Sequence, residues 1–333
     1  MKDHTTITEK WQQAAQFSDT YDTFLVVSHV QPDGDAIGST VAVAHLLKQR
    51  GKQFILTNDS PIPDKYYFMD MATHILPWDE AKREKFDAVI SVDCADRLRL
   101  GAVEIVLQQG FPLLNIDHHS TNDHFGTVNL VLDDQSATAE VLYHFIEHLQ
   151  LTWDRPLAEA IYTGVLTDTG GFRYTNTSPS SMELAAHLLR YGVNPGDIAE
   201  HVFERISRAK VEMLKAALNS LTISDDGKIA WVTITAEQMK RAGAKEEDLG
   251  GIVNIARNVE DVEVGILFKQ LDSHSVKVSL RSRDQVDVAM VAKKLGGGGH
   301  ARAAGCTMEG SLHEVKQTLL AATRKALVPC QTK

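Results

Sequence analysis

Cysteine is scarce in this sequence. Only Cys94, Cys306 and Cys330 occur, and none of them lies in a CxxC pair. An odd number of scattered cysteines provides neither a disulfide framework nor a zinc ribbon. We therefore expect all three to be reduced thiols without a chemical role.

Long hydrophobic runs are also missing. No stretch of about 20 apolar residues could span a bilayer, and the first residues, MKDHTTITEKWQQ, contain no apolar core of a secretion signal. The sequence thus predicts neither a transmembrane helix nor a signal peptide. We expect a cytoplasmic protein that does not bind membranes.

Positive charge is in deficit. The 34 Lys and Arg are outnumbered by 44 Asp and Glu, which gives a formal net charge of −10. A protein of this charge repels long polyanions, so we do not expect a non-specific binder of duplex DNA. A small basic pocket, or divalent cations that offset part of the negative charge, is still compatible with a phosphate ligand.

The GxSxG and P-loop motifs are absent as well, so neither a serine hydrolase nor a P-loop enzyme is indicated.

What the sequence does contain is an alternation of strand-like and helix-like segments. Its 333 residues suggest two domains, at a typical size of about 150 residues each. Apolar runs predict strands and amphipathic stretches predict helices, the strands at 23–28, 53–57, 87–92 and 112–116 and the helices at 37–51 and 136–150. This pattern predicts an α/β domain with a mostly parallel sheet.

The pattern changes in the second half of the chain. Residues 155–220 read as nearly all helix, with a break at TGGFRYTNTSP. After residue 228 three longer apolar runs follow, KIAWVTIT, VEVGILFKQL and HSVKVSLRS. They predict a second, smaller α/β domain, and the absence of internal repeats excludes a solenoid.

Polar residues follow three of the predicted strands directly. FLVVS is followed by His29, Asp33 and Asp35, DAVISV by Asp93, and PLLNI by Asp117, His118 and His119. Because the carboxyl ends of parallel strands share one edge of a sheet, we expect these side chains to converge. Asp168 continues the apolar stripe of a predicted helix, which should direct its carboxylate into the same protein interior.

Each of these residues has a simpler explanation when taken alone. A single Asp after a strand is most often a helix N-cap or a turn former, and a lone His pair is more often a surface or core feature than a ligand. Four such groups of matching chemistry are hard to attribute to chance. Asp and His without Cys suit Mn²⁺, Mg²⁺ or Fe²⁺ better than structural zinc, and their number favours a two-metal site with Asp93 as the bridge.

These motifs resemble the DHH phosphoesterases that carry a DHHA1 domain. The resemblance covers nearly the whole chain, in the order HVQPDGDAIGS, VDCAD, NIDHHSTN, TGVLTDTGGFRY, and then SLRSR with GGGGHARAAG. It implies a larger DHH domain at 1–200, a helical linker at 201–222 and a DHHA1 domain at 223–333. It also implies that the active site lies in the cleft between the two domains.

The resemblance implies a role for each candidate residue of the first domain. One manganese ion would have the ligands His29, Asp33 and Asp93, and the other would have Asp35, Asp93, His118 and Asp168. Asp117 would orient the neighbouring histidines. His119 would face the scissile phosphate and so contact substrate.

The predicted DHHA1 domain contains four consecutive glycines at 296–299. They could be a flexible turn, but His300 and Arg302 follow at once, which favours a phosphate cradle in which backbone N–H groups of Gly297, Gly298 and Gly299 approach an anion. Arg281 resembles the family's other phosphate-contacting arginine. Arg283 is a weaker candidate, which we expect to be solvated.

The two-domain layout resembles that of stand-alone bacterial members of the family, the nanoRNases that are also phosphatases of 3′-phosphoadenosine 5′-phosphate (pAp). This implies manganese-dependent hydrolysis of short single-stranded RNA to 5′-mononucleotides and of pAp to AMP and phosphate. Two alternatives stay open: a phosphodiesterase for cyclic di-AMP or pApA, and a nucleotide-binding sensor without catalysis. The oligomeric state is open too, with a homodimer as one option.

Overall fold

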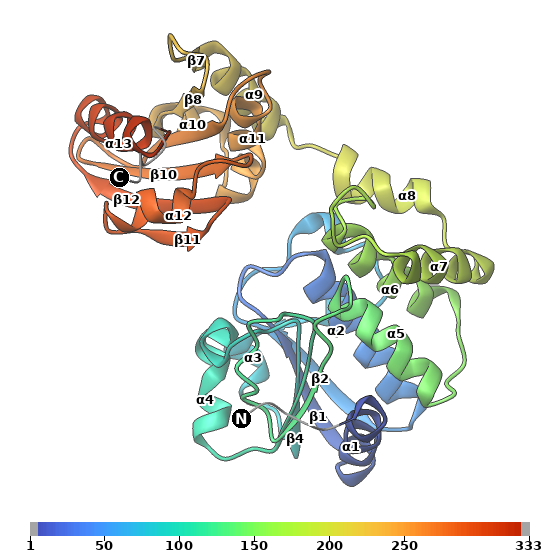
Figure 1. Cartoon of the computed structure of the whole chain (residues 1–333). Helices are drawn as coiled ribbons and strands as arrows, with labels where there is room; N and C mark the ends of the chain where they lie inside the picture. The colour runs from blue at the N-terminus through green and yellow to red at the C-terminus, as the bar shows by residue number, and fades with distance from the viewer. Residues whose placement is uncertain (1–5, 328–333) are drawn as a thin grey trace, which may run out of the picture. The chain divides into compact units, whose positions relative to one another are not determined.

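The protein is described here by a computed structural model that covers residues 6–327 (Figure 1). The chain divides into two compact units, Met1–Arg205 and Ile206–Lys333. Their cores are separate, so each unit is described by itself.

The first unit is built on a six-stranded sheet in the order β3-β2-β1-β4-β5-β6. All pairs of neighbouring strands run parallel. The strands are β1 (Thr23–Ser28), β2 (Gln53–Asn58), β3 (Leu76–Pro77), β4 (Ala88–Val92), β5 (Leu113–Asp117) and β6 (Val128–Val131). The predicted parallel α/β fold is therefore confirmed, and the two strands that the sequence did not predict, β3 and β6, are short strands at the sheet edges.

Helices cover both faces of this sheet. They are α1 (Ile7–Thr20), α2 (Gly34–Gln49), α3 (Trp78–Ala81), α4 (Ile105–Gln108), α5 (Thr138–His148), α6 (Arg155–Asp168), α7 (Pro179–Leu188) and α8 (Pro195–Ala199). Phe24 and Val26 of β1 belong to the core formed with α2, α5 and α6, whereas Leu25 and Val27 belong to a second core with Trp78 of α3. Because both faces are buried, β1 is apolar at successive positions rather than at alternate ones.

Two glycines allow the helices α2, α5 and α6 to pack closely against one another. A Cβ atom on Gly38 of α2 would lie 2.5 Å from the carbonyl oxygen of Ala160, in α6. A Cβ atom on Gly164 of α6 would lie 2.5 Å from the Cβ of Ala139, in α5. Side chains at these positions would push α2, α5 and α6 apart. Of these helices, α2 carries Asp35 and α6 carries Asp168, both residues of the predicted metal site.

The second unit contains a mixed sheet in the order β11-β12-β10-β9-β8-β7. Its β8 and β9 strands are parallel, and the other neighbours are antiparallel. The strands are β7 (Thr222–Ile223), β8 (Ile229–Ile234), β9 (Val264–Gln270), β10 (Ser275–Ser282), β11 (Gly298–His300) and β12 (Ala303–Glu309). The helices are α9 (Arg208–Ser220), α10 (Ala236–Ala242), α11 (Ile252–Arg257), α12 (Val288–Lys293) and α13 (Leu312–Leu327).

The second sheet is covered unevenly. Val276, Val278 and Leu280 of β10 are buried in a core that also contains residues of α12 and α13. The alternate residues Lys277 and Arg281 are exposed and half-buried. The β10, β12 and β11 side of this sheet therefore has one accessible face, and Arg281 lies on it.

Two of the three cysteines lie within the described residues. Cys94 and Cys306 are buried and not joined in a disulfide, and burial raises the pKa of the Cys94 thiol to about 12. Such a thiol stays protonated at neutral pH and is a poor nucleophile. Cys330 lies outside the described residues.

Within residues 6–327, no helix has the length and apolar character needed to cross a membrane.

Candidate metal centre

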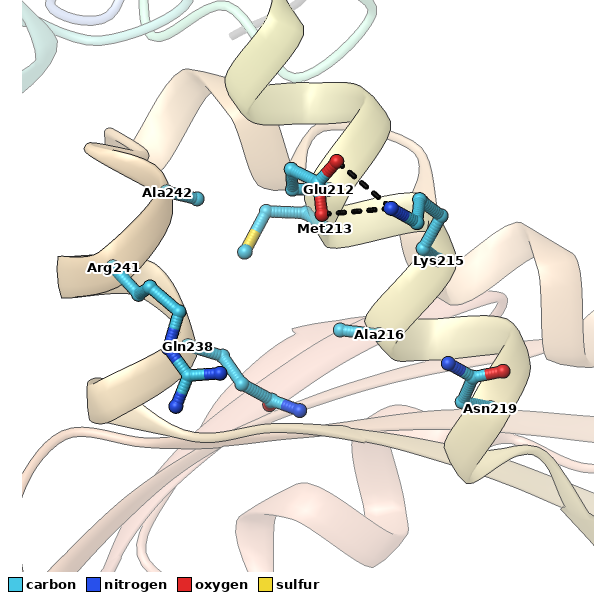
Figure 2. Close-up of a pocket in the computed structure, with 8 residues that line it drawn as sticks. All are labelled: Glu212, Met213, Lys215, Ala216, Asn219, Gln238, Arg241 and Ala242. Atoms are coloured by element: carbon cyan, nitrogen blue, oxygen red, sulfur yellow. Dashed lines mark hydrogen bonds and ion pairs between the residues drawn. The ribbon is translucent and has the colours of Figure 1, made fainter.

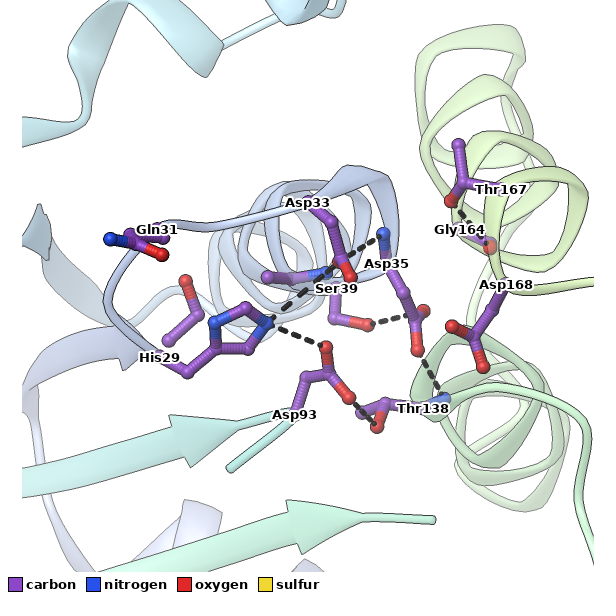
Figure 3. A network of polar contacts seen from close by, with 12 residues as sticks. His29, Gln31, Asp33, Asp35, Ser39, Asp93, Thr138, Gly164, Thr167 and Asp168 are labelled. Carbon is purple, nitrogen blue, oxygen red and sulfur yellow. Dashed lines mark hydrogen bonds and ion pairs between the residues drawn. The ribbon is translucent and has the colours of Figure 1, made fainter. Parts of the chain in front are cut away.

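The predicted site residues of the first unit meet at the carboxyl edge of its sheet. Figure 3 shows five of them, His29, Asp33, Asp35, Asp93 and Asp168. β1 leads directly into His29, β4 into Asp93, and β5 ends at Asp117, which precedes His118 and His119. Two helices that begin or end at the same edge bring the remaining carboxylates, Asp33 and Asp35 at the start of α2 and Asp168 as the last residue of α6. The convergence expected from strand order and helix spacing is thus present in the fold.

Asp93 lies at the centre of the group. Its Oδ2 is 3.4 Å from Nε2 of His29 and its Oδ1 is 3.7 Å from Nε2 of His118, so each carboxylate oxygen faces a different histidine. The residue is 2% exposed. Its backbone has φ = 55°, in the left-handed region that residues other than glycine rarely adopt. Strain of this kind costs about 1–3 kcal/mol and is concentrated at functional sites.

Asp33 combines the two roles that the sequence left open. Its Oδ1 accepts hydrogen bonds from the backbone N–H groups of Asp35 and Ala36, both at 3.1 Å, and so caps α2. The same oxygen is 3.9 Å from Nε2 of His29. N-capping and a place in the cluster are therefore compatible for this residue.

Burial opposes a charge on His29, but the hydrogen bonds and charges of Asp33 and Asp93 outweigh it and raise the pKa of His29 to about 10. In the metal-free protein a proton on this histidine thus offsets part of the carboxylate charge.

Asp35 and Asp168 form the second half of the cluster together with His118. Asp35 is completely buried and accepts hydrogen bonds from the backbone N–H groups of Thr138, at 2.7 Å, and Ala139, at 2.9 Å. Oδ2 of Asp168 is 3.4 Å from Nε2 of His118. Burial, and then repulsion from Asp93 and other carboxylates, raise the pKa of Asp35 well above its usual range and that of Asp168 to about 6.

Asp117 contacts one of the two histidines that follow it. Its carboxylate is completely buried, with Oδ1 2.8 Å from Nδ1 of His119 and Oδ2 accepting a hydrogen bond from Asn122 at 2.6 Å. Burial opposes the charge, but these hydrogen bonds lower the pKa of Asp117, and the bond to Asp117 raises the pKa of His119. His118 is oriented differently, since its Nδ1 lies 3.3 Å from the carbonyl oxygen of Gln135.

The donor atoms fit divalent cations. Three sets have their ligand atoms within 4.8 Å of one another: His29, Asp33 and Asp93; Asp35, His118 and Asp168; and Asp93, His118 and His119. Carboxylate oxygen and imidazole nitrogen without thiolate are ligands for Mn²⁺, Mg²⁺ or Fe²⁺. The raised pKa values of Asp35 and Asp168 report carboxylates crowded in a buried place, where a cation would relieve the repulsion.

Several residues that support the cluster were not predicted. Thr138 and Ala139 bond Asp35, Gln135 faces His118, and Asn122 bonds Asp117. Asn122 stands inside the motif NIDHHSTN, where its spacing from Asp117 could have drawn attention to it. The 135–139 segment carries no comparable signal because its contributions are mostly backbone groups.

In the second unit, two predicted substrate residues lie in one row across the open sheet face. Arg281 of β10 is paired with Ala303 of β12, and Ala303 is paired with His300 of β11. Directly paired residues project to the same face, so a small alanine separates the arginine from the histidine. Burial and the nearby Arg257 lower the pKa of Arg281.

Arg302 is exposed and bonded to backbone. Its guanidinium donates hydrogen bonds to the carbonyl oxygens of Asp284 and, at 3.2 Å, Val286. Arg283, the weaker candidate, is exposed and donates to the carbonyl oxygen of Val259.

The glycine-rich segment is more ordered than the turn or loop expected from sequence. Gly298–His300 form the edge strand β11, paired with β12. A Cβ atom on Gly297 or Gly299 would come within 2.5 Å of backbone oxygens of β12, so both glycines are needed for this pairing. A Cβ atom on Gly298 would have no neighbour within 4 Å. Gly298 is thus an exposed member of β11 at which the fold leaves room for a ligand.

A separate hollow of about 490 Å³ lies between α9 and α10 (Figure 2). It is lined by Glu212, Met213, Lys215, Ala216, Asn219, Gln238, Arg241 and Ala242. Its charged groups form ion pairs within their own helices, Lys215 with Glu212 and Arg241 with Glu237. It contains none of the predicted substrate residues.

A parallel sheet with Asp and His gathered at its carboxyl edge is typical of a metal-dependent hydrolase, and sequence comparison supplies the family. Residues 23–165 match the DHH family, N-terminal domain, and residues 226–328 match the DHHA1 domain. The chain belongs to the DHH family of phosphoesterases.

Two curated relatives extend over most of the chain. A bifunctional oligoribonuclease and PAP phosphatase NrnA from Thermus thermophilus is 33% identical, over 91% of this chain and 89% of the relative. The Bacillus subtilis protein of the same name is 25% identical, over 86% and 90%. Among solved structures, an exopolyphosphatase-related protein from Bacteroides fragilis has a TM-score of 0.87 at 25% identity and covers 96% of both chains.

Proposed function

We propose that this protein hydrolyses phosphoester bonds in pAp, to AMP and phosphate, and in short single-stranded oligoribonucleotides, to 5′-mononucleotides. The observation that carries this proposal is the gathering of histidines and carboxylates at one sheet edge around Asp93. The names of the relatives from Thermus thermophilus and Bacillus subtilis supply the substrates.

We assign two divalent cations, Mn²⁺ first, to this edge. One is held by His29, Asp33 and Asp93, and the other by Asp35, Asp93, His118 and Asp168. Bound there, such cations supply a water that ionises near neutral pH and positive charge for phosphate oxygens. Mg²⁺ prefers oxygen ligands such as carboxylates over imidazole nitrogen. A site that combines carboxylates with imidazoles therefore favours Mn²⁺.

The chain's own residues would orient the substrate. Asp117 fixes Nδ1 of His119, which leaves Nε2 as the nitrogen that can donate to an oxygen of the scissile phosphate. The raised pKa of His119 widens the pH range over which Nε2 carries a proton and can donate this hydrogen bond. No side-chain nucleophile is required, because water is the attacking group.

The second unit would hold another part of the substrate. Arg281 and His300, on one face of its sheet, would bind a second phosphate or a chain end together with Arg302 and the backbone of Gly297, Gly298 and Gly299. Such a grip would favour short substrates that carry a second phosphate or a free chain end. Duplex and circular nucleic acids would be poor substrates, and the net charge of −10 also disfavours them.

Rates on four substrates in one Mn²⁺ buffer test the proposal: pAp, an RNA of two to five nucleotides, pApA and cyclic di-AMP. We expect rapid release of phosphate from pAp and of mononucleotides from RNA. Faster turnover of pApA or cyclic di-AMP would favour the phosphodiesterase alternative. Binding of all four without turnover would favour a sensor and contradict the proposal. A single-stranded and a duplex oligonucleotide of equal length test the preference for single strands.

A further inference from the structure

One short segment, residues 135–139, contacts three of the candidate metal ligands. The carbonyl oxygen of Gln135 faces Nδ1 of His118 at 3.3 Å. Thr138 and Ala139 donate their backbone N–H groups to the two oxygens of Asp35. The hydroxyl of Thr138 donates to Oδ1 of Asp93 at 3.0 Å. Thr138 and Asp35 are more than 100 positions apart in sequence, whereas Gln135 and His118 are close. The segment therefore joins parts of the cluster that come from different elements (Figure 3).

The segment is itself held in place from two sides. Glu140 is completely buried, and its Oε2 accepts hydrogen bonds from the backbone N–H of Ser136, at 2.9 Å, and from its hydroxyl. The side chain of Asn176 donates to the carbonyl oxygens of Ser136, at 3.0 Å, and Asp168, at 3.2 Å. A buried carboxylate needs hydrogen-bond donors, and both donors to Glu140 belong to Ser136, two residues before Thr138.

Thr138 differs from its neighbours because it bonds two carboxylates at once. Its N–H bonds Asp35 and its hydroxyl bonds Asp93. In the proposed function, Asp35 belongs to one metal position and Asp93 to both. Thr138 is therefore the residue through which the orientations of these two carboxylates are linked.

The orientation of Asp93 needs a fixing contact. The terminal torsion of an aspartate is broad, so the side-chain rotamer does not determine which oxygen points where. The left-handed backbone of Asp93 places the carboxylate but does not set its rotation. With Oδ1 bonded to Thr138, Oδ1 faces His118 and Oδ2 faces His29.

We propose that Thr138 is a positioning residue whose hydroxyl sets the rotation of the Asp93 carboxylate, so that one oxygen serves each metal position. This inference rests on the proposed two-metal function and adds to it a residue that determines whether the two ions share a bridge. Removal of the hydroxyl should uncouple the two ions rather than simply weaken the fold.

Three substitutions separate these effects. Thr138→Val removes the hydroxyl but keeps the backbone N–H and the branched shape, whereas Thr138→Ser keeps the hydroxyl. Thr163→Val is the matched control, because Thr163 is also completely buried but its hydroxyl bonds the carbonyl oxygen of Glu159 within α6. Thermal melting of each metal-free variant measures the effect on folding.

The readouts are Mn²⁺ binding by calorimetry and the electron paramagnetic resonance spectrum at two equivalents of Mn²⁺. Two bridged ions give an exchange-coupled spectrum, and isolated ions give the six-line spectrum of Mn²⁺. We expect coupled spectra for the wild type, Thr138→Ser and Thr163→Val. Thr138→Val should show the six-line signal and bind at least one ion about 10- to 100-fold more weakly, the usual loss when a partner of a metal ligand is removed.

The outcomes distinguish this inference from the proposed function. A wild type that binds two coupled ions, with a Thr138→Val variant of unchanged spectrum and affinity, overturns the inference alone. An equal loss of coupling in Thr163→Val also overturns it, because the effect would then be a general loss of stability. A wild type that binds no pair of ions overturns both.

Discussion

The candidate metal residues of the first unit and the predicted substrate residues of the second are held in opposite ways. His29 and Asp93 are 4% and 2% exposed, and each carboxylate of the cluster has hydrogen-bond or ion-pair partners from other elements. Gly298, His300 and Arg302 are exposed and lie on or beside a three-residue edge strand. The first group is enclosed by the fold, and the second is open to solvent and to a ligand.

This difference has a physical consequence for function. Groups that stabilise a transition state act best when they are fixed before the substrate arrives. Groups that grip a remote part of the substrate contribute through binding and alignment. Substitutions should therefore cost most in the first unit and less in the second, and the following predictions can break or sharpen that contrast.

The largest effect is expected for Asp93→Asn. Asparagine tolerates the left-handed backbone at this position better than alanine does, so the change mainly removes charge from the bridge. We expect a loss of about 10³-fold or more in kcat for pAp, the scale of losing a transition-state electrostatic group.

Arg283→Ala is the control for Asp93→Asn, since this exposed side chain bonds only the carbonyl oxygen of Val259 among the hydrogen bonds found in residues 6–327. Its activity should stay near that of the wild type. Similar losses in the two variants would contradict the central role of Asp93.

Mn²⁺ affinity should rise with pH. Metal binding requires ionised carboxylates and neutral imidazoles. At pH 5 Asp168, with its pKa raised to about 6, is mostly protonated and His29, with its pKa raised to about 10, carries a proton. Both protons must leave on binding at pH 5, whereas at pH 8 the proton of Asp168 has already left. We expect binding to strengthen steeply from pH 5 to 7 and less steeply above.

The same pKa shift has a consequence for stability without metal. Because the pKa of Asp168 is higher in the folded state than its ordinary value of 3.8, the protonated form stabilises the fold at low pH, and this contribution is lost as the pH rises towards about 6. The melting-temperature increase produced by Mn²⁺ should be larger at pH 8 than at pH 5. An increase that is equal at both pH values would contradict these proton assignments.

Arg302→Ala should have an intermediate effect that depends on the substrate. A charge-assisted contact to phosphate contributes about 1.5–3 kcal/mol, or roughly 10- to 100-fold. We expect kcat/KM for pAp and RNA dinucleotides to fall by this factor, with metal content unchanged. Bis-p-nitrophenyl phosphate has no second phosphate to grip, so its hydrolysis should be unaffected.

An equal loss on bis-p-nitrophenyl phosphate would mean that Arg302 supports the fold. The structure offers a specific reason to check this, because its guanidinium bonds the carbonyl oxygens of Asp284 and Val286. Melting temperatures of Arg302→Ala and Arg302→Lys separate the structural contribution from the binding one.

The smallest effect is expected at Gly298. A Cβ atom there meets nothing within 4 Å, so Gly298→Ala should leave the melting temperature unchanged. If the backbone approaches a phosphate, KM for pAp should rise about 2- to 10-fold, the value of one hydrogen bond. Gly299→Ala is the contrasting variant, because its positive φ of 142° and a 2.5 Å contact with the carbonyl oxygen of Ala303 should lower the melting temperature.

The gathering of these Asp and His residues could be predicted from sequence because it follows from general rules. Parallel strands end at one edge, which brings His29 and Asp93 together although they are far apart in the chain. Helical spacing placed Asp168 on the inner side of α6, where it contacts His118. The parallel sheet of the first unit followed from the same alternation of segments.

Other features depend on contacts that no local pattern encodes. His118 and His119 are adjacent, yet one faces Gln135 and the other Asp117, so a common orienting role for Asp117 could not be resolved from sequence. Thr138 could not be recognised from the sequence, because one of its two hydrogen bonds to the cluster comes from its backbone N–H group. The glycine-rich segment has no strand pattern of its own and becomes β11 only through pairing with β12.

The most direct test of the central claim is phosphate release from pAp by protein stripped of metal with a chelator and then titrated with Mn²⁺. The cluster around Asp93 predicts no release before Mn²⁺ is added and restored release afterwards in the wild type, but not in Asp93→Asn. Full activity of the stripped wild type, or equal recovery in Asp93→Asn, would contradict a metal-dependent site at this edge of the sheet.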